Sequence, residues 1–383
     1  MLFRFTEEEE MLRRQARRLA QKEIHAITAE HEEEESKEMV SQLIKAIAGA
    51  DLCRLFVEEA YGGVGIKALR ICIVREELAQ VSNTADGIFA ELGLGTFGVN
   101  VVGREEQKKK YLPRVARGEI LATFSLTEPN AGSDVAGIQA TARADGDVYV
   151  LNGEKAFASV AGYADIYTVF AKTDPSKGRH GISAFIIDKG TPGLEIGRMY
   201  LLAGGPEFTI NLTDCRVPRE NLIGEEGAGF RIALGTLDVF RVTVGAAAVG
   251  MAQAAFEEAV SYAGKRIAFG QPIMSNQAIQ FKLADMATEI EAARWLVYRA
   301  AHVRDEGLSE RPIKFASMSK LFATEVAGRV TDEALQVHGG WGAVKGTKVE
   351  RLWREARLPR LYEGTSEIQR NTIFREVMRE GKR

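Results

Sequence analysis

The chain has 383 residues and a mass of 42.0 kDa, which is long for one compact core and indicates two or three domains. Its composition is 45% hydrophobic and 27% charged, which excludes a largely disordered or fibrous protein, and its formal charge of −3 gives no electrostatic footprint for nucleic acid. No apolar run approaches the length of about 20 residues that crosses a bilayer, and the acidic start MLFRFTEEEE does not resemble a targeting segment, so we expect a cytoplasmic protein without stable membrane insertion.

The first region, residues 1–121, has the period of α-helices. Thr6 and Glu9 have the spacing of a capping box, in which a hydroxyl and a carboxylate satisfy free amides of a first helical turn. Helical spacing of apolar residues recurs over 37–50 and 68–81, and EEQKKKYL resumes it after an apolar, glycine-containing stretch at 87–103. We therefore expect an N-terminal α-helical domain.

The second region, residues 122–226, has the pattern of a β domain. Short runs rich in β-branched and aromatic residues, ATFSL, VYVL, IYTVFA, ISAFIID and FTINL, are separated by turn-forming residues. Asn152-Gly153 stands between VYVL and EKAFAS, which predicts a two-residue hairpin there. Strands without intervening helices favour an antiparallel sheet or small barrel, so the fold class expected is α+β.

The third region, residues 227–383, returns to the helical period over longer segments. Residues 229–264, 276–305 and 311–338 carry apolar side chains in steps of three and four, and Gly339-Gly340 predicts the end of the last segment. Long helices of this kind pack as a bundle. The predicted order is α-helical, β, then a C-terminal helical bundle.

Several common kinds of site are disfavoured. The glycine pairs Gly63/Gly65 and Gly227/Gly229 do not lie in βαβ units, so we interpret them as turns and not as dinucleotide-binding loops. The three cysteines are widely separated and no histidines have metal-ligand spacing, so neither a disulfide framework nor a metal site is predicted. The histidines are His25, His31, His180, His302 and His338.

Six segments have residue patterns too particular to be explained by packing alone. ATFSLTEPNAGSD (122–134) places hydroxyls and a glycine turn beside a strand, and in NGEKAFAS (152–159) an extended strand would put Phe157 and Ser159 on one face. An aromatic ring beside a hydroxyl suits a flat heterocycle. The other segments are LDVFR (237–241), KRIAFGQPI (265–273), QVHGGWG (336–342) and LYEGTSEIQR (361–370). Together, in this order and over essentially the whole chain, the six segments closely resemble the FAD-dependent acyl-CoA dehydrogenase family.

The resemblance implies a fold and a set of FAD contacts. The fold has an N-terminal α domain, a middle antiparallel β domain and a C-terminal four-helix bundle. Phe157 would lie against the flavin ring, Ser159 near its hydride-accepting nitrogen N5, and Thr127 at its pyrimidine edge. Arg266 and Gln336 belong to elements that, in the family, complete a neighbouring subunit's FAD site, so a homotetramer built from dimers is expected. The implied cofactor contacts are Phe124, Leu126, Thr127, Ser133, Phe157, Ser159, Arg266, Phe269, Gln277, Gln336, Gly339, Gly340, Thr365 and Glu367.

The resemblance also implies α,β-dehydrogenation of an acyl-CoA thioester, with electrons passed to an electron-transfer flavoprotein. Glu363 would be the base, because removal of a weakly acidic α-proton needs a carboxylate within hydrogen-bond reach, and Gly364 would let a backbone amide approach the thioester oxygen. Without the resemblance, Glu363 would be only an acid in the turn before a helix whose capping box is Ser366 and Gln369. The implied substrate contacts are Ser133, Asp238, Arg241, Tyr362 and Gly364.

Two places bear on the substrate. Glu91 is the only charged residue from Gly87 to Gly103, a stretch that lines the acyl cavity in the family. It would recognise a polar acyl terminus or act as a second base on a ring or branched acyl group, which would favour alicyclic or dicarboxylic substrates, or else it would be an exposed rim residue. Before FTINL the family usually has an Arg and Ser motif, whereas this chain reads LLAGGPEF (201–208). Acyl chain length stays open, and an acyl-CoA oxidase or a non-catalytic acyl-CoA-binding protein are the alternative functions.

Overall fold

The computed structural model describes residues 4–30, 36–203 and 205–381, so His31 and Gly204 lie outside the described residues. The chain forms two compact units, each built from separate stretches of sequence. The bundle unit contains Met1–His25, Lys67–Asn83 and Asp238–Arg383, and the sheet unit contains Ala26–Ile66 and Thr84–Leu237. The expected domain limits at residues 121 and 226 stay a prediction.

The helices of the first 121 residues follow the sequence pattern closely. Helix α1 (Glu7–Leu19) begins at Thr6, whose side chain accepts a hydrogen bond from the Glu9 amide while the Glu9 carboxylate accepts from the Thr6 amide, so the capping box is confirmed. It continues through a π-helical turn into α2 (His25–Glu30). The helices that follow are α3 (Lys37–Gly49), α4 (Ala68–Ala79), α5 (Asn83–Val102) and α6 (Glu105–Ala116). The apolar stretch at 87–103 is therefore part of a helix.

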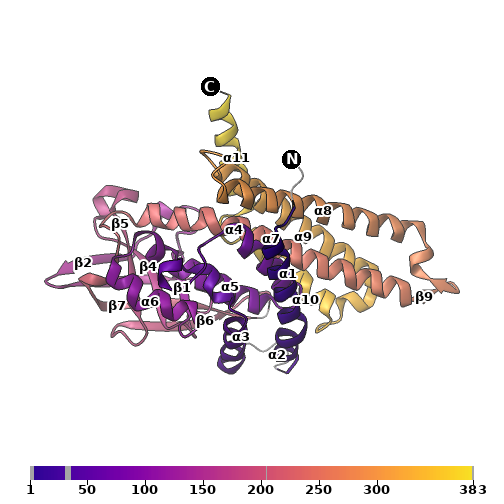
Figure 1. The fold of residues 1–383 in the computed structure, drawn as a ribbon, viewed down its shortest axis with the longest axis horizontal. Helices are drawn as coiled ribbons and strands as arrows, with labels where there is room; N and C mark the ends of the chain where they lie inside the picture. Colours follow the sequence, from indigo (N-terminus) through magenta and orange to yellow (C-terminus); the bar gives the residue numbers. More distant parts are fainter. Residues whose placement is uncertain (1–3, 31–35, 204, 382–383) are drawn as a thin grey trace. The chain divides into compact units, whose positions relative to one another are not determined.

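An eight-stranded sheet forms the core of the sheet unit, with the strand order β6-β7-β3-β2-β4-β5-β8 and β1 paired to β4 (Figure 1). Most pairs are antiparallel, as expected, but β1 and β2 pair with β4 in parallel. Buried aromatic and branched side chains such as Tyr167, Phe185 and Ile210 fill its core. The strands are β1 (Ala122–Ser125), β2 (Thr141–Asp145), β3 (Val148–Lys155), β4 (Ile166–Lys172), β5 (Ile182–Asp188), β6 (Leu194–Tyr200), β7 (Pro206–Pro218) and β8 (Leu222–Ile223).

The hairpin predicted at Asn152-Gly153 is wrong. Strand β3 runs through both residues, and its register with β7 shifts between Leu151 and Gly153, which is a bulge. Gly153 has φ 144°, and a Cβ there would lie 2.6 Å from the Cβ of Ala140, so the glycine serves a bulge with close packing. The tight turn lies earlier, at Gly146-Asp147 between β2 and β3.

Long helices form the bundle, as the sequence predicts. They are α7 (Gly229–Lys265), α8 (Gln277–Asp305), α9 (Ile313–His338), α10 (Lys348–Glu355) and α11 (Ser366–Glu380), and Figure 1 shows α8 and α9 side by side. The C-terminal stop of α9 is confirmed, since Gly339 has φ 59° at its cap. Helix α7 is long and apolar enough to span a membrane, but its most apolar window is 78% buried inside the protein, which is typical of a core helix.

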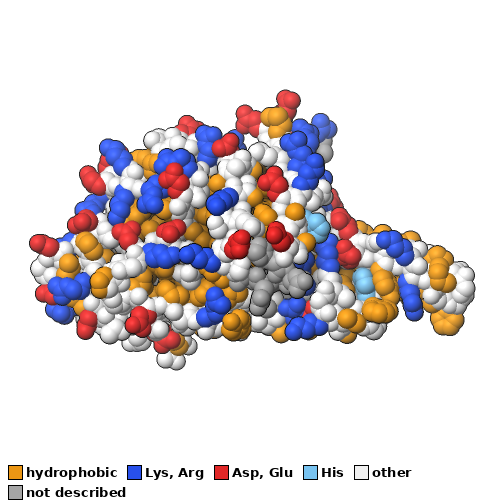
Figure 2. Space-filling view, turned by 90° about the horizontal axis from the view of Figure 1, so that it is seen from below, with side chains coloured by type: hydrophobic (Ala, Val, Ile, Leu, Met, Phe, Trp, Pro, Cys, Tyr) orange, Lys and Arg blue, Asp and Glu red, His pale blue; other side chains and the backbone are white. Residues whose placement is uncertain are grey.

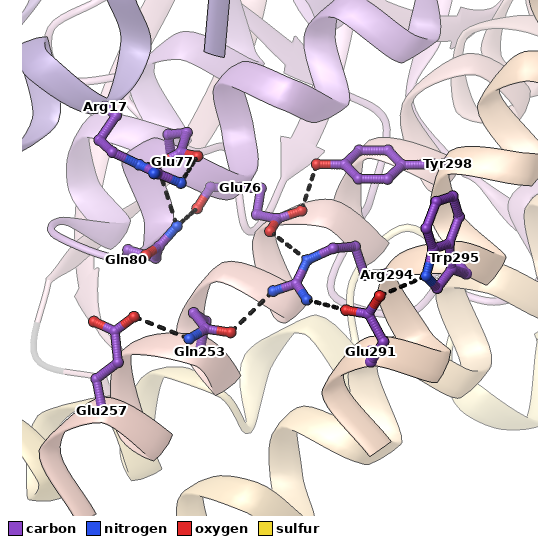
Figure 3. Close-up of polar contacts among 10 residues, drawn as sticks. All are labelled: Arg17, Glu76, Glu77, Gln80, Gln253, Glu257, Glu291, Arg294, Trp295 and Tyr298. Carbon is purple, nitrogen blue, oxygen red and sulfur yellow. Dashed lines mark hydrogen bonds and ion pairs between the residues drawn. The ribbon is translucent and has the colours of Figure 1, made fainter. Parts of the chain in front are cut away.

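A polar network joins four helices within the bundle unit (Figure 3). The Glu76 carboxylate of α4 accepts hydrogen bonds from Tyr298 Oη (2.7 Å) and Arg294 Nε (2.9 Å) of α8, and Arg294 also donates to Gln253 of α7. Glu77 pairs with Arg17 of α1 at 2.7 Å. The network borders a cavity of about 700 Å³. Because these arginines are paired with carboxylates, we interpret the network as helix packing.

The charge distribution agrees with the small net charge. On the face drawn in Figure 2, Lys and Arg side chains are interspersed with Asp and Glu side chains among the described residues. Such a surface lacks the single-sign field that concentrates a polyanion.

Candidate functional site

The two segments predicted to hold the flavin ring lie against each other in the sheet unit. The Lys155 ammonium, fully buried at the end of β3, donates to the Leu126 carbonyl (3.3 Å) and to the Glu128 carboxylate (2.7 Å). The Ala156 amide donates to the Thr127 carbonyl at 2.9 Å. Burial lowers the pKa of Lys155 to about 8, while Glu128 favours its charged form. A buried ion pair therefore fixes the backbone on both sides of Thr127.

The loop after Lys155 presents an aromatic ring to solvent. β3 ends at Lys155, and Phe157 and Val160 both have φ 54°, so the extended strand assumed for Phe157 and Ser159 is wrong. The Phe157 side chain is 56% exposed, although the residues on either side, Ala156 and Ala158, are buried. Non-glycine residues in the left-handed region cost free energy and persist where the surroundings hold them. The exposed ring is free to cover a flat partner.

Ser159 is held at both its backbone and its hydroxyl. Its carbonyl accepts a hydrogen bond from Thr123 Oγ1 (2.8 Å), and its hydroxyl donates to Glu207 Oε1 of β7 (2.9 Å). Burial raises the pKa of Glu207 to about 7. Ser133 is exposed in the turn that follows Thr127, which is half-buried.

In the bundle unit, a strained turn carries the predicted base. Glu363 has φ 51° and Gly364 has φ 92°. The Glu363 carbonyl accepts from Arg241 Nε (3.3 Å) and Gln369 Nε2 (3.2 Å), and the Gly364 carbonyl accepts from Gln369 Nε2 (2.8 Å) and Lys320 Nζ (2.7 Å). Three side chains thus hold the backbone of one turn, and Oε2 of Glu363 is shielded from solvent. This arrangement fixes the backbone position from which the Glu363 side chain extends.

Arg241 and Asp238, predicted as a pair, are one helical turn apart on α7. Arg241 is 5% exposed and its Nη1 lies 3.4 Å from Asp238 Oδ1. Burial lowers the pKa of the Arg241 guanidinium and raises that of the Asp238 carboxyl, while the opposite charge of each partner opposes the shift. Arg241 is therefore not the solvated surface arginine that a bundle commonly carries.

The helix after the turn is capped differently from the sequence expectation. The N-cap of α11 is Thr365, whose hydroxyl accepts from the Ile368 amide, so the Ser366/Gln369 capping box is wrong. Ser366 instead donates to Glu325 of α9 at 2.6 Å. Glu367 and Tyr362, which flank the turn, are both exposed.

The remaining predicted FAD residues of the bundle unit lie on its surface. Phe269 forms the tip of a two-residue hairpin between β9 (Ile267–Ala268) and β10 (Gln271–Pro272), where its side chain is fully exposed and its φ is 51°. Arg266 lines a cavity of about 430 Å³ together with Lys265 and His338. The exposed members of this set are Arg266, Phe269, Gln277, Gln336, Gly339 and Gly340.

Glu91 is buried on α5, 8% exposed, so the alternative of an exposed rim residue is wrong. Its Oε2 accepts a hydrogen bond from the backbone amide of Phe124 (3.0 Å), and the Phe124 ring packs edge-on against Phe170. This hydrogen bond from the start of the flavin segment explains why the Glu91 carboxylate is buried, and no contact with a substrate is needed to explain it. Contact of Glu91 with an acyl group stays a prediction.

No group of three or more His, Cys, Asp or Glu side chains that could hold a metal ion occurs among the residues that the structure describes.

Family models of the N-terminal, middle and C-terminal domains of acyl-CoA dehydrogenase match residues 6–119, 123–210 and 227–378. The chain therefore belongs to the acyl-CoA dehydrogenase family. An acyl-CoA dehydrogenase of Bacillus subtilis is 43% identical over 97% of this chain and 98% of its own. A 3-(aryl)acrylate reductase of Clostridium sporogenes is 41% identical over 98% and 100%. A chain in a structure of the electron transferring flavoprotein of Acidaminococcus fermentans has a TM-score of 0.92 and 39% identity, covering 99% and 100%.

The protein is thus an FAD-dependent oxidoreductase that acts on CH–CH bonds. The residues present fit this cofactor, because an exposed aromatic ring, the hydroxyl of Ser159 and the fixed backbone at Thr127 supply stacking and hydrogen bonds for a flavin. Four supporting side chains, Lys155, Gln369, Lys320 and Glu207, were not predicted to make these contacts. Lys155 and Gln369 stand inside the quoted motifs, whereas Lys320 and Glu207 carry no local signal of their contacts. These four residues act through the backbone or through a predicted site residue.

Proposed function

We propose that this protein catalyses α,β-dehydrogenation of an acyl-CoA thioester to the 2-enoyl-CoA, with Glu363 as the base that removes the α-proton. The observation that supports this most is the Glu363–Gly364 turn, a strained backbone whose two carbonyls accept four hydrogen bonds from Arg241, Lys320 and Gln369. Strain that is maintained by buried donors marks functional turns. An ordinary surface acid would need none of these contacts.

The residues of this turn have separate tasks. The Glu363 carboxylate takes the proton, and the left-handed Gly364 leaves space for a backbone amide to approach the thioester oxygen, where negative charge develops. Arg241 holds the Glu363 carbonyl and places a buried positive charge near the base. Exclusion of water around a carboxylate makes it a stronger base.

The sheet unit supplies the contacts for the redox cofactor. FAD, when bound, accepts the β-hydrogen as hydride. Phe157 would cover one face of its ring system, Ser159 would hydrogen-bond near N5, and Thr127 with Ser133 would serve the ring edge and the CoA side. The Lys155–Glu128 pair holds these segments together.

Electron-transfer flavoprotein is the proposed electron acceptor, supported by the similarity to a chain in a structure of the Acidaminococcus fermentans electron transferring flavoprotein. The exposed Arg266, Phe269 and Gln336 support a homotetramer in which each FAD site is completed by a neighbouring subunit. Acyl preference, including the alicyclic or dicarboxylic groups that Glu91 would suit, is left to experiment.

Reduction of an acrylate-type double bond is the second candidate, because a relative that is 41% identical over 98% of this chain is a 3-(aryl)acrylate reductase. The two functions use the same proton and hydride positions in opposite directions. They differ in which partner reacts with the oxidised protein. In dehydrogenation this partner is the saturated substrate, and in reduction it is an electron donor.

The purified protein should be yellow, and a panel of saturated acyl-CoA thioesters added without oxygen should bleach the flavin for at least one member. Glu363→Gln should retain FAD and slow bleaching by about 10²–10⁴-fold, the usual contribution of a general base. Glu380→Gln, an exposed acid of α11, is the matched control and should behave like the wild type. Rapid peroxide formation would indicate an oxidase, a colourless protein would indicate a non-catalytic homologue, and a normal bleaching rate in Glu363→Gln would exclude Glu363 as the base.

A further inference from the structure

Glu207 occupies an unexpected place in the sheet unit. It is the second residue of β7, inside LLAGGPEF, where the sequence departs from the family pattern. One carboxylate oxygen, Oε1, accepts the hydrogen bond from the Ser159 hydroxyl at 2.9 Å. The other, Oε2, is shielded from solvent and has no hydrogen-bond partner among the described residues. A half-satisfied, shielded carboxylate thus lies directly behind the hydroxyl predicted to face the flavin.

The surroundings of Glu207 contain little charge to balance it. Its cross-strand neighbour on β6 is Met199, and the adjacent Arg198 lies over the Phe208 ring, 5.8 Å from the centroid. On β3, Lys155 is bound to Glu128, and the loop at 156–160 carries no charged side chain. Burial raises the pKa of Glu207 to about 7, and the hydrogen bond from Ser159 only partly opposes this. The carboxyl therefore gains and loses its proton near neutral pH.

The two protonation states of Glu207 require opposite hydrogen bonds with Ser159. An ionised carboxylate can only accept, so the Ser159 hydroxyl must donate to it and offers lone pairs to any other partner. A protonated carboxyl can donate to Ser159 Oγ, which releases the hydroxyl hydrogen for another acceptor. The distance of 2.9 Å suits either direction.

We propose that Glu207 is a positioning residue that sets the direction in which the Ser159 hydroxyl donates its hydrogen bond, and thereby whether that hydroxyl can donate to the flavin nitrogen that takes the hydride. The proposal rests on the function proposed above, in which Ser159 lies near N5. An oxidised flavin offers an acceptor at this nitrogen and a reduced flavin offers a donor. Protonated Glu207 therefore matches the oxidised cofactor, and ionised Glu207 matches the reduced one.

The test is a pH titration of the oxidised holoenzyme, followed by its flavin absorption between pH 5.5 and 8.5 without substrate. The wild type should show one spectral transition near pH 7. Glu207→Gln, whose amide donates permanently to Ser159, should show the low-pH spectrum of the wild type at every pH. Glu154→Gln, which removes an exposed carboxylate from β3, is the matched control and should keep the transition.

Ser159→Ala separates a hydrogen-bond effect from a charge effect. If the hydroxyl transmits the protonation of Glu207, the transition should be lost in Ser159→Ala as well, and the double variant should have the pH-independent spectrum of Ser159→Ala. A transition that persists in Ser159→Ala would show that the flavin senses only the charge of Glu207, and this would overturn the proposal. Should Glu207→Gln not fold, Glu207→Asp, whose shorter side chain does not reach Ser159, should also lose the transition.

The outcome is distinct from that of the proposed function. A yellow protein that acyl-CoA bleaches, but whose oxidised spectrum is independent of pH over this range, would overturn the role of Glu207 alone. A colourless protein would overturn both. A separate readout, the carboxyl C=O stretch in the infrared spectrum, should show a protonated acid that titrates near pH 7 in the wild type and is missing in Glu207→Gln.

Discussion

The fully buried ammonium of Lys320 donates a hydrogen bond of 2.7 Å to the carbonyl oxygen of Gly364. Lys320 lies in the first third of α9, 43 positions before Glu363, and its pKa is lowered to about 7 by burial while Glu363 opposes the shift. A buried cation that is bound to a backbone carbonyl is costly, so it indicates that the position of the turn is important.

We expect Lys320→Met to weaken the turn and lower kcat about tenfold or more, since a hydrogen bond from a charged group contributes about 1.5–3 kcal/mol. FAD content should not change. Lys314→Met, on the same helix as Lys320, removes an ion pair with the exposed Glu380 and should have little effect. Stopped-flow flavin bleaching measures the rate, and an unchanged rate in Lys320→Met would contradict the role of this contact.

The lowered pKa of Lys320 also predicts a pH dependence of stability. Between about pH 7 and 10.5 the unfolded chain keeps the proton that the folded protein has lost, so the free energy of unfolding should rise with pH over this window. Urea denaturation of the wild type and of Lys320→Met at pH 7 and pH 9 measures it. The rise should be smaller in the variant, and equal slopes would argue against a shifted Lys320.

Gly364→Ala should fold less stably and lose activity. The residue has φ 92°, and a Cβ there would lie 2.7 Å from Gln369 Nε2, so the substitution strains the backbone and displaces one of its three anchors. We expect a cost of about 1–3 kcal/mol. Gly235→Ala, in α7 with open space around its Cβ, should be neutral or slightly stabilising. Thermal unfolding and bleaching rates of both variants provide the comparison.

Glu128→Gln should destabilise the sheet unit and reduce FAD content, because it leaves the buried Lys155 ammonium without its counter-charge. Breaking a buried pair from one side costs about 3–5 kcal/mol. Asp145→Asn breaks the exposed Arg216–Asp145 pair of the same sheet and should cost less than about 1 kcal/mol. The double variant Glu128→Gln/Lys155→Met should recover part of the stability. Equal melting temperatures for Glu128→Gln and Asp145→Asn would contradict this view of the pair.

Two substitutions at Glu91 separate its anchoring contact from a contact with substrate. Glu91→Ala leaves the buried Phe124 amide unpaired and should cost about 1–3 kcal/mol. Glu91→Gln keeps an acceptor oxygen and should keep stability. If Glu91 also contacts the acyl group, Glu91→Gln should alter the order of preference across the acyl-CoA panel without loss of FAD. An unchanged order would leave Glu91 with the anchoring contact only.

The sequence predicted those features that have a local signature. Periodicity gave the helices of both units, and Thr6 with Glu9 gave the start of α1, because capping depends on residues three positions apart. The hairpin prediction at Asn152-Gly153 was wrong, because the two residues have the composition of a hairpin turn but pairing with β7 keeps the strand extended. Ser366 was misassigned because Glu325, far away in sequence, takes its hydroxyl. The resemblance identified Glu363, but no local pattern identified Lys320 or Glu207, whose contacts span 44 and 48 positions.

Phe157, Phe269 and Glu363 adopt a backbone conformation that L-amino acids with a Cβ disfavour. Replacement of any of them by glycine or asparagine would relax the main chain, so a laboratory selection for heat resistance alone should repeatedly recover such changes at these positions. The variants recovered in this way should be more stable to heat but less active. A library varied at these three positions and screened in parallel for thermal stability and turnover would measure how much stability the native residues cost and how much activity they provide.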